Sequence, residues 1–554
     1  HHLIATATTP TTTPDINPCL VTAIKQLQTE TGHRFLNRND KLIKPQTIKN
    51  QGVDALVIAT SVAEPIKIVL AGLTHDVSLE YAQHAISTTY AETSCQITLS
   101  GRDARPTRET GTTKHAFSES DFIIIVGGVD GGNTSGIIEL TKNIRASLEL
   151  VPVENRPQII YAGNNRFRSH VANVLSDLAS FKSLDNITHH NLHGIPHELD
   201  KFYHARKIHP ILTDWQTDVE IATAKSYSQA IYYIGQSYKA KILGVDVGSK
   251  TTTIAMNRHD TMSTVQQGDF QNHVTCTDIG VGLSLDSLLK QSSLEKIYAK
   301  ALAPQRWLNF DLIVVGGQAL TQVNDLALSV LTILDGLEPI GICDIMCDNI
   351  GVLNILGGIA NIQPLAAAQV TDSLLDSSSV LNKIGVIVAP VGIGKIGSTA
   401  LHVHVIFDHK REPLMLDISF GTVHVIPLGI GEKAKLDLHP TKKFDLKGTG
   451  KFVGKRVVAK VEGGTLGIII DARGRPISMS RDDVKRRKQI QTWLGQLGCM
   501  LEFQPEKDID TWIHARQHNV EQAKTLFYQL NTYCTEITHR VKILKHILDE
   551  IYEE

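Results

Sequence analysis

Two regions of this sequence share one order of elements: a short apolar run, a pair of glycines and then a helical pattern. The apolar run 121–126 precedes the glycines at 127–128, and the apolar run 311–315 precedes the glycines at 316–317. Strands that alternate with helices favour a sheet with parallel strands covered by helices. The sequence therefore predicts an α/β protein with two halves, whose similarity lies in architecture and not in residue identity.

The stretch ILGVDVGSKTTTIA at residues 242–255 predicts a β-hairpin with an acid near its tip. Apolar residues surround Asp246, and Gly248 and Ser249 turn the chain before a β-rich pattern resumes. A carboxylate at the end of a buried strand, followed by a turn rich in N–H and hydroxyl donors, suits a polyphosphate with its Mg²⁺. The common phosphate loop is excluded because it needs adjacent Gly, Lys and Ser or Thr, whereas Ser249 separates Gly248 from Lys250.

Composition excludes several classes of partner. Lys and Arg number 55 against 57 Asp and Glu, so no field of the whole protein favours nucleic acid or a membrane. The seven cysteines form neither a disulfide framework nor a zinc spacing, which is typical of reduced thiols in the cytoplasm. The longest apolar runs, such as 122–129, have the length of strands, and no signal peptide precedes them. We therefore expect a cytoplasmic protein without nucleic-acid or membrane contacts.

The order of patterns divides the chain into five predicted segments. They are a first α/β half at 1–205, a helical connector at 206–239, a second α/β half at 240–380, an all-β domain at 381–480 and a helical tail at 481–554. Between 383 and 480, strand patterns alternate with turn residues and no helical pattern intervenes, which predicts a separate barrel or sandwich.

Local patterns predict the individual elements. Residues 1–7 have the pattern of a strand already in progress, so we expect His1 and His2 to be a tag remnant or the chain to lack its natural beginning. A helix is predicted at 15–32, with Asp15 as its cap. Other strands are predicted at 55–60, 66–70, 95–99, 158–162, 264–267 and 341–347, and other helices at 78–90, 134–150, 198–239, 282–303, 321–334 and 353–375.

Two further patterns match ligand-binding motifs only in part. Residues 392–397, GIGKIG, match the dinucleotide fingerprint, but the alternating residues after them predict a strand where the motif needs a helix. The cobalamin motif Asp-x-His-x-x-Gly is approached only by Asp437-Leu438-His439, which lacks the glycine. We therefore expect neither a dinucleotide site nor a cobalamin-binding subunit.

Histidines and cysteines are assigned structural positions. A histidine cluster falls next to Gly194 and Pro196, which predicts a solvated loop without a helical face for metal. Its members are His189, His190, His193 and His197. Cys343 and Cys347 are expected to bracket a buried strand, with a redox role left open.

Five runs of sequence together resemble one family. The runs are LIATATTPTT, IIIVGGVDGGN, IIYAGN, LGVDVGSKTT and VEGGTLGIIIDARGRPI. They resemble the MutL-type glutamate mutase accessory family, within the superfamily of actin, heat-shock chaperone and sugar-kinase ATPases. The resemblance covers residues 1 to about 477 and implies two actin-like (ribonuclease H-like) halves around ATP, with an extra C-terminal β-domain.

The resemblance also implies roles for individual residues. Asp246 would hold Mg²⁺ through water and orient the attacking water. Phosphate would contact Gly248, Ser249, Lys250, Thr251 and Thr252. The nucleotide would approach two glycine-rich loops, at Gly316, Gly317 and Gln318 and at Gly127, Gly128, Asp130, Gly131, Gly132 and Asn133. The chain departs from the superfamily in two respects: the first phosphate hairpin, Asp-x-Gly-Ser-x-x-Thr, is absent, and Lys250 replaces a small residue.

These observations lead to two hypotheses of different class. The first is an ATP-binding accessory or reactivating protein for an adenosylcobalamin-dependent mutase, with the mutase subunits as partners and hydrolysis of ATP left open. The alternative is a non-hydrolysing scaffold or self-assembling protein on the same fold, which would be a homo-oligomer. The intact Asp246 hairpin favours the first, and the missing first hairpin favours the second. A small-molecule kinase shares the fold, but the sequence shows no base for its substrate.

Overall fold

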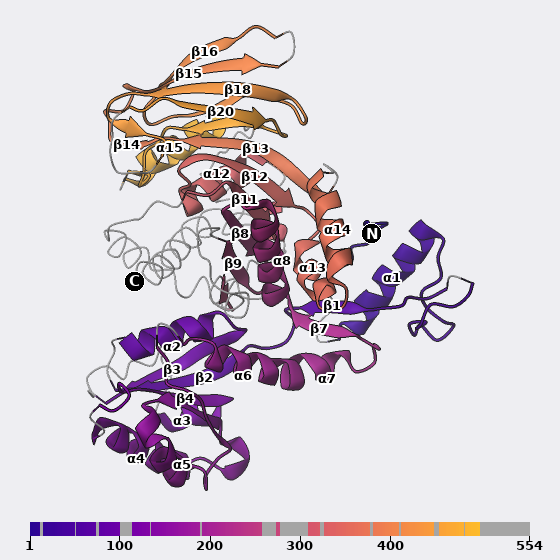
Figure 1. The fold of residues 1–554 in the computed structure, drawn as a ribbon, viewed down its shortest axis with the longest axis vertical. Coiled ribbons are helices and arrows are strands. Elements are labelled where there is room, and N and C mark those ends of the chain that lie inside the picture. The colour runs from indigo at the N-terminus through magenta and orange to yellow at the C-terminus, as the bar shows by residue number, and fades with distance from the viewer. Residues whose placement is uncertain are drawn as a thin grey trace. The chain divides into compact units, whose positions relative to one another are not determined.

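The computed structural model describes residues 1–10, 15–49, 51–73, 77–99, 113–132, 135–188, 191–257, 273–277, 309–321, 326–376, 380–408, 411–447, 454–480 and 482–498. Contacts divide the chain into two compact units. Unit 1 comprises residues 1–230, 262–277 and 353–371, and unit 2 comprises 231–261, 278–352 and 372–554. Figure 1 labels the elements of both units.

Unit 1 contains a five-stranded parallel sheet in the order β3-β2-β4-β5-β6. Its strands are β2 (Ile66–Gly72), β3 (Ala91–Thr98), β4 (Phe122–Gly127), β5 (Gln158–Gly163) and β6 (Phe181–Ser183). Alternate residues of β4 enter two separate cores, with Ile124 in one and Ile123 in the other. Both faces of the sheet are therefore covered, which explains why its strands are continuous apolar runs.

Helices cover the two faces of this sheet (Figure 1). One face packs against α2 (Val77–Ser87) and α6 (Gly194–Tyr203), and the other against α4 (Ser135–Glu149) and α5 (Arg168–Leu175). The short helix α3 (Thr113–Ser118) contributes Phe117 to the second core. The 3-10 turns η1 (Val153–Asn155) and η2 (Asn165–Phe167) flank β5.

A smaller part of unit 1 surrounds a second, two-stranded parallel sheet. Its strands are β1 (Val57–Thr60) and β7 (Val219–Ala222). The helical elements of this part are α1 (Asn17–Thr31), the π-helical turn η3 (His204–Ile208), α7 (His209–Leu212), the start of α8 (Thr223–Tyr238), α13 (Leu353–Ala360) and the start of α14 (Pro364–Asp376). Helix α13 packs on β1, and the Gly358 N–H donates to the Ser226 hydroxyl at 3.0 Å. The strand β10 (His273–Cys276) contacts α2.

Unit 2 contains a mixed sheet whose strands run in the order β9-β8-β11-β12-β13-β21-β17. The strands are β8 (Ile242–Val247), β9 (Thr252–Asn257), β11 (Leu312–Gly316), β12 (Gly341–Asp348), β13 (Leu381–Ala389), β17 (Val423–Ile426) and β21 (Gly467–Asp471). Strands β8, β11 and β12 are parallel to one another, and β13 is antiparallel to β12. The helices of this unit include α11 (Gln318–Thr321), α12 (Leu326–Leu337) and α15 (Asp483–Gln496).

A four-stranded antiparallel sheet, β16-β15-β18-β20, shares a core with the far end of the large sheet. Its strands are β15 (Thr399–Phe407), β16 (Leu414–Ser419), β18 (Lys433–Pro440) and β20 (Val457–Glu462), and β14 (Val391–Gly392) pairs separately with β19 (Phe444–Asp445). Val403 and Leu436 from this sheet and Val386 and Ile468 from the large sheet all lie in that core. The two sheets therefore stabilise each other.

Most of the predicted elements form, but the prediction at the start of the chain is wrong. Residues 1–10 have no regular secondary structure, because no described strand pairs with them. The helix predicted at 15–32 is α1, which ends at Gly32 with φ +70°. The N-cap residue is Ile16, so the prediction that Asp15 caps this helix is wrong. Asp15 lies two residues before the helix and accepts from the Asn17 N–H at 2.9 Å.

Three other predictions differ from the structure, because the pairing of distant strands or a local break in a helix determines the elements that form. Three strands of the predicted all-β domain, β13, β17 and β21, extend the sheet of β8, β11 and β12 instead of forming a separate barrel or sandwich. The helix predicted at 353–375 is two helices, α13 and α14, with Pro364 starting the second. The stretch 198–239, predicted to be helical, also contains strand β7, because residues 219–222 pair with β1. Strands β6, β10, β14, β18 and β19 were not predicted. The predictions at 264–267, 282–303 and most of the helical tail lie outside the described residues.

The histidine and cysteine predictions have mixed outcomes. His193 and His197 belong to the start of α6 and not to a loop, because Pro196 is tolerated in the first helical turn. His189 and His190 lie outside the described residues. Cys343 and Cys347 are buried on β12, and burial raises the pKa of each thiol to about 12. The strand after residues 392–397 is β15, which confirms that no helix follows the glycines. Across the described ranges, no helix is both long and apolar enough to span a bilayer.

Two buried histidines predict how the stability of unit 1 depends on pH. Burial lowers the pKa of His84 and of His273 to about 4, below the usual 6.5. The unfolded chain then binds protons more tightly than the folded chain does. The stability of unit 1 is therefore complete, with respect to these histidines, above about pH 6.5, and part of it is lost as the pH falls toward 4. We expect each histidine to lower the free energy of unfolding of unit 1 by on the order of 2 kcal/mol at pH 4.5 relative to pH 7.5. Hydrogen exchange of α2 measures this change.

The variant His84→Leu should lose part of this pH dependence, because leucine cannot be protonated. His33→Leu, at an exposed position of unit 1, serves as the control and should keep the pH dependence of the parent chain. A pH profile of His84→Leu identical to that of the parent would contradict the prediction.

Candidate functional site

The predicted hairpin forms at one end of β8. Strands β8 and β9 are antiparallel, with Asp246 opposite Thr253. The Gly248 N–H donates to the Thr251 carbonyl at 2.9 Å and closes the turn between them. Asp246 is the penultimate residue of β8, and its side chain is 7% exposed. The hairpin therefore places a carboxylate at a strand end, as the sequence predicts.

The glycines at 316–317 lie directly beside this carboxylate. Gly316 ends β11 and is in register with Asp246. A Cβ atom at Gly316 would lie 3.0 Å from Asp246 Oδ1, so any larger residue would push against the carboxylate. Gly317 has φ +82°, and a Cβ there would lie 2.1 Å from the Val247 carbonyl oxygen. Only glycines allow this close approach of the two strand ends.

A third strand of the parallel group also ends in an acid, which the sequence analysis did not select. Asp348 is the last residue of β12 and is 2% exposed. Val315 on β11 is in register with Cys347 on β12, and the two strands are parallel. The next residues, Gly316 and Asp348, therefore lie side by side. Asp246, Gly316 and Asp348 thus form one row across three neighbouring strands, in which side chains point to the same face. Asp348 Oδ1 accepts from the Val352 N–H at 3.0 Å and shapes the following turn. An acid directly after the predicted strand at 341–347 was the signal available in the sequence.

The other residues predicted on the hairpin differ in exposure. Ser249 is exposed at the tip and Lys250 is half-buried. Thr251 and Thr252 are 8% and 2% exposed, so their hydroxyls lie within the fold. Gln318 begins α11 directly after the glycines.

The glycine-rich loop at 127–132 belongs to unit 1 and follows β4. Gly127 and Gly128 have φ of +118° and +82°, which residues with a side chain rarely adopt. The Gly132 N–H donates to the Val129 carbonyl at 2.8 Å. Gly131 also has a positive φ, and Asn133 lies outside the described residues.

Asparagine side chains determine the shape of this loop. Asp130 accepts from the N–H and the side-chain amide of Asn165, at 2.7 and 2.8 Å. Asn186 donates to the Gly128 carbonyl at 2.9 Å and to Asp130 at 3.1 Å. Asn164, which is fully buried, donates to the Val129 carbonyl. The Asp130 carboxylate therefore stabilises the loop itself, a role that its position in the sequence does not reveal.

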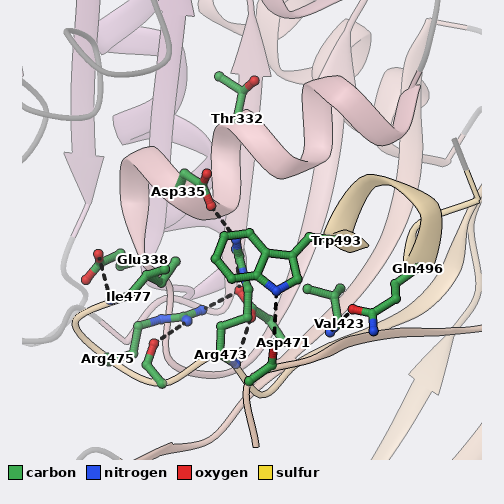
Figure 2. Close-up of polar contacts among 12 residues, drawn as sticks. Thr332, Asp335, Glu338, Val423, Asp471, Arg473, Arg475, Ile477, Trp493 and Gln496 are labelled. Atoms are coloured by element: carbon green, nitrogen blue, oxygen red, sulfur yellow. Dashed lines mark hydrogen bonds and ion pairs between the residues drawn. The ribbon is translucent and has the colours of Figure 1, made fainter. Parts of the chain in front are cut away.

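A group of buried charges lies in unit 2 between β21, α12 and α15 (Figure 2). Arg473 donates to Asp471 at 2.8 and 2.9 Å and to Asp335 at 2.6 Å, and Arg475 donates to Asp471 at 3.0 Å. Arg475 also donates to the Pro339 carbonyl, and Glu338 accepts from the Ile477 N–H. We call these five charged residues, Asp335, Glu338, Asp471, Arg473 and Arg475, the buried ion-pair network.

The two arginines compensate for the burial of the acids. Burial by itself raises the pKa of Asp471, but Arg473 and Arg475 outweigh it and hold this pKa well below its usual range. Burial also raises the pKa of Asp335, and Arg473 opposes that rise without cancelling it. Arg473 is 4% exposed and contacts both acids, so the network depends on it most.

In the described part of the chain, no three side chains among His, Cys, Asp and Glu come together in an arrangement that could hold an ion. An ion at the hairpin would therefore depend on one or two carboxylates together with ligand oxygens and water, which is how Mg²⁺ usually binds.

A model of the MutL protein family matches residues 1–311. The chain belongs to this family. The MutL match includes both the loop at 127–132 and the Asp246 hairpin, and it confirms the resemblance to the MutL-type glutamate mutase accessory family that the sequence runs indicated. No curated protein matches this MutL chain.

Solved structures align only distantly with this MutL chain. A nucleotide-free acetone carboxylase, from a study of ATP-dependent acetone carboxylation, aligns over 74% of this chain and 77% of its own, with 8% identity and a TM-score of 0.24. The type II variant of the Aquifex aeolicus Ppx/GppA phosphatase aligns over 43% of this chain and 65% of its own, with 11% identity and a TM-score of 0.13. TM-scores this low carry no conclusion about the fold or function of this chain.

The buried ion-pair network predicts a large effect of Arg473→Met on stability. The variant leaves Asp335 and Asp471 buried without their main partner, which we expect to cost about 3–5 kcal/mol in the free energy of unfolding of unit 2. Denaturant unfolding followed by hydrogen exchange of β21 measures this cost.

The matched control is Arg456→Met. Arg456 also forms two hydrogen bonds with one aspartate, Asp437, but its side chain is 59% exposed. We expect the control to leave unfolding nearly unchanged, because exposed ion pairs contribute little. Equal effects of the two substitutions would contradict the assigned importance of the buried network.

Proposed function

We propose that this chain is an ATP-binding accessory protein of an adenosylcobalamin-dependent mutase. Membership of the MutL family suggests the accessory role. The observation that supports ATP binding is the position of the Asp246 carboxylate, which lies at a strand end against Gly316 and beside the turn at Gly248. That arrangement provides an acid, a close approach of backbone and a donor-rich turn in one place.

The residues present fit a magnesium polyphosphate. Asp246 would hold Mg²⁺ through water, and Asp348 lies on the same row of the sheet, one strand away from Gly316. The exposed tip at Ser249 and Lys250 would contact phosphate oxygens, with Gly248 in the turn. Bound Mg²⁺ would neutralise part of the phosphate charge. Gly316 and Gly317 would let the rest of the nucleotide lie against the backbone, because neither residue adds a side chain of its own.

We further propose that the two α/β halves are actin-like. Each unit has parallel strands, and in each a strand ends at a glycine pair, Gly127–Gly128 after β4 and Gly316–Gly317 after β11. On this proposal the nucleotide also contacts the glycine-rich loop after β4, at Gly127, Gly128, Asp130, Gly131, Gly132 and Asn133. Hydrolysis would use Asp246 to orient the attacking water, and the mutase subunits would be the partners of the chain.

Binding of Mg-ATP measured by titration calorimetry tests the assignment of Asp246. We expect Asp246→Asn to weaken binding about 10- to 100-fold, because the amide keeps the shape of the carboxylate but loses the charge that holds the hydrated ion. The difference should vanish in EDTA. Gly316→Ala should weaken binding as well, because its Cβ would displace the carboxylate.

Two controls make this test specific. Asp311→Asn changes an aspartate at the opposite end of β11, where it accepts from the Lys241 N–H at 2.8 Å. Gly194→Ala adds a methyl group at the start of α6 in unit 1, where the nearest atom would be one of Leu184 at an ordinary contact distance of 3.5 Å. Both controls should bind Mg-ATP as the parent chain does. Equal binding by the parent and Asp246→Asn in the presence of Mg²⁺ would contradict the proposed site.

The role toward a mutase is tested by recovery of activity. We expect the chain with Mg-ATP to restore activity to a purified adenosylcobalamin-dependent glutamate mutase that turnover has inactivated, and Asp246→Asn to restore much less. Recovery at the same rate without the chain would contradict the accessory role. Recovery that is independent of ATP would favour the non-hydrolysing alternative.

A further inference from the structure

Helix α15 packs on unit 2 near its C-terminal end. Its sequence, DVKRRKQIQTWLGQ, is strongly polar, and Trp493, which is 5% exposed, is its buried aromatic residue. The Trp493 indole N–H donates to the Gly421 carbonyl at 3.0 Å, and Gln496 accepts from the Val423 N–H at 2.9 Å. Val423 begins β17, which is the last strand of the large sheet. Apart from Trp493, the described residues of α15 are exposed or half-buried, so the helix can leave the edge of the sheet while the described cores stay intact.

The main anchor of α15 is a charged side chain from the buried ion-pair network. The Arg473 guanidinium carbon lies 4.6 Å from the centre of the Trp493 ring, within the range of a cation–π contact. The same guanidinium donates to Asp335 on α12 at 2.6 Å. Figure 2 shows Arg473 between the indole and the Asp335 carboxylate. Arg473 therefore connects α15 to the C-terminal end of α12.

The end of α12 in turn borders the strands of the candidate site. Thr332, Ile333, Gly336 and Leu337 of α12 line a small apolar pocket of about 20 Å³. Val245, Val247 and Val315 line the same pocket from β8 and β11. Val245 and Val247 are the neighbours of Asp246, and Val315 precedes Gly316. The pocket is about the size of one water molecule, and it marks the place where α12 meets these strands.

We propose that α15 is a releasable strap, and that its docking on Arg473 positions α12 and thereby orders the strand ends at Asp246 and Gly316. With α15 docked, Arg473 is fixed between Trp493 and Asp335, and α12 is held at its C-terminal end. With α15 released, Arg473 loses the indole and keeps its bonds to Asp471 and Asp335, so the C-terminal end of α12 is held less firmly against Val245 and Val247. Trp493 is a positioning residue in this device, since it acts through Arg473 and α12.

Hydrogen exchange of the full chain, without nucleotide, tests the coupling. We expect Trp493→Leu to speed exchange several-fold in two separate segments, α15 itself and the strand ends at 245–247 and 315–317. Thr492→Val, on the neighbouring exposed position of α15, should change neither segment. Faster exchange in α15 with unchanged exchange at 245–247 and 315–317 would overturn the proposal.

A milder variant covers the case in which Trp493→Leu unfolds unit 2 as a whole. Gln496→Ala removes only the bond to the Val423 N–H and leaves the indole on Arg473. It should speed exchange in α15 and at 245–247 by a smaller factor, while exchange in β12 and β13 stays as in the parent. Release of α15 without any effect at 245–247 would again overturn the strap.

Nucleotide supplies a second measurement, which rests on the proposed function. Coupling between two sites is reciprocal. Saturating Mg-ATP should therefore slow the exchange of α15 in the parent chain by some factor, and Trp493→Leu should weaken Mg-ATP binding by the same factor. We expect a factor of about 5 to 50. An affinity unchanged in a variant whose α15 is released would overturn the coupling. If the parent chain binds no Mg-ATP, the proposed function fails, and the nucleotide-free exchange alone decides the strap.

Discussion

The arrangement of unit 2 depends on burying two arginines and three acids in one place. Removing such charges from water is costly, and the cost is offset only when each charge finds a partner with good geometry. Asp471 and Arg473 meet that condition, since both oxygens of the carboxylate accept from the guanidinium. Asp335 on α12 and Glu338 just after it lie more than 130 positions earlier in the chain. The network therefore joins the end of the large sheet to the helix that borders the candidate site.

Glycine is the second constraint, because it allows the strand ends to approach each other. Gly317 lies so close to the Val247 carbonyl that even a methyl group would collide with it. Gly316 leaves the space into which the Asp246 carboxylate extends. The same backbone requirement appears at Gly127 and Gly128, where amide side chains complete the loop. In both units the glycines allow the close packing of the loop that follows the strand.

Local features of the candidate site could be predicted from the sequence. The hairpin at Asp246 and the glycines at 316–317 follow from short patterns of apolar and turn residues, and the structure brings them together. Asp348 was missed because its relevance comes from the register of β12 beside β11, which no local pattern encodes. In the sequence, the run DARGRPI carries only a resemblance. Asp335, the partner of Arg473, lies in the largely apolar helix α12, so the spacing of residues alone does not identify the network.

Long-range pairing also explains where the fold departed from expectation, and it has a consequence for how the chain is made. Strand β21 lies between β13 and β17, although both precede it in the sequence. As the chain leaves the ribosome, β17 has no described neighbour in this sheet until residues 467–471 emerge. Contacts between distant segments form slowly. Arg473 follows β21 by two residues, so the strand that completes the sheet and the charge that secures it reach the folding protein almost together.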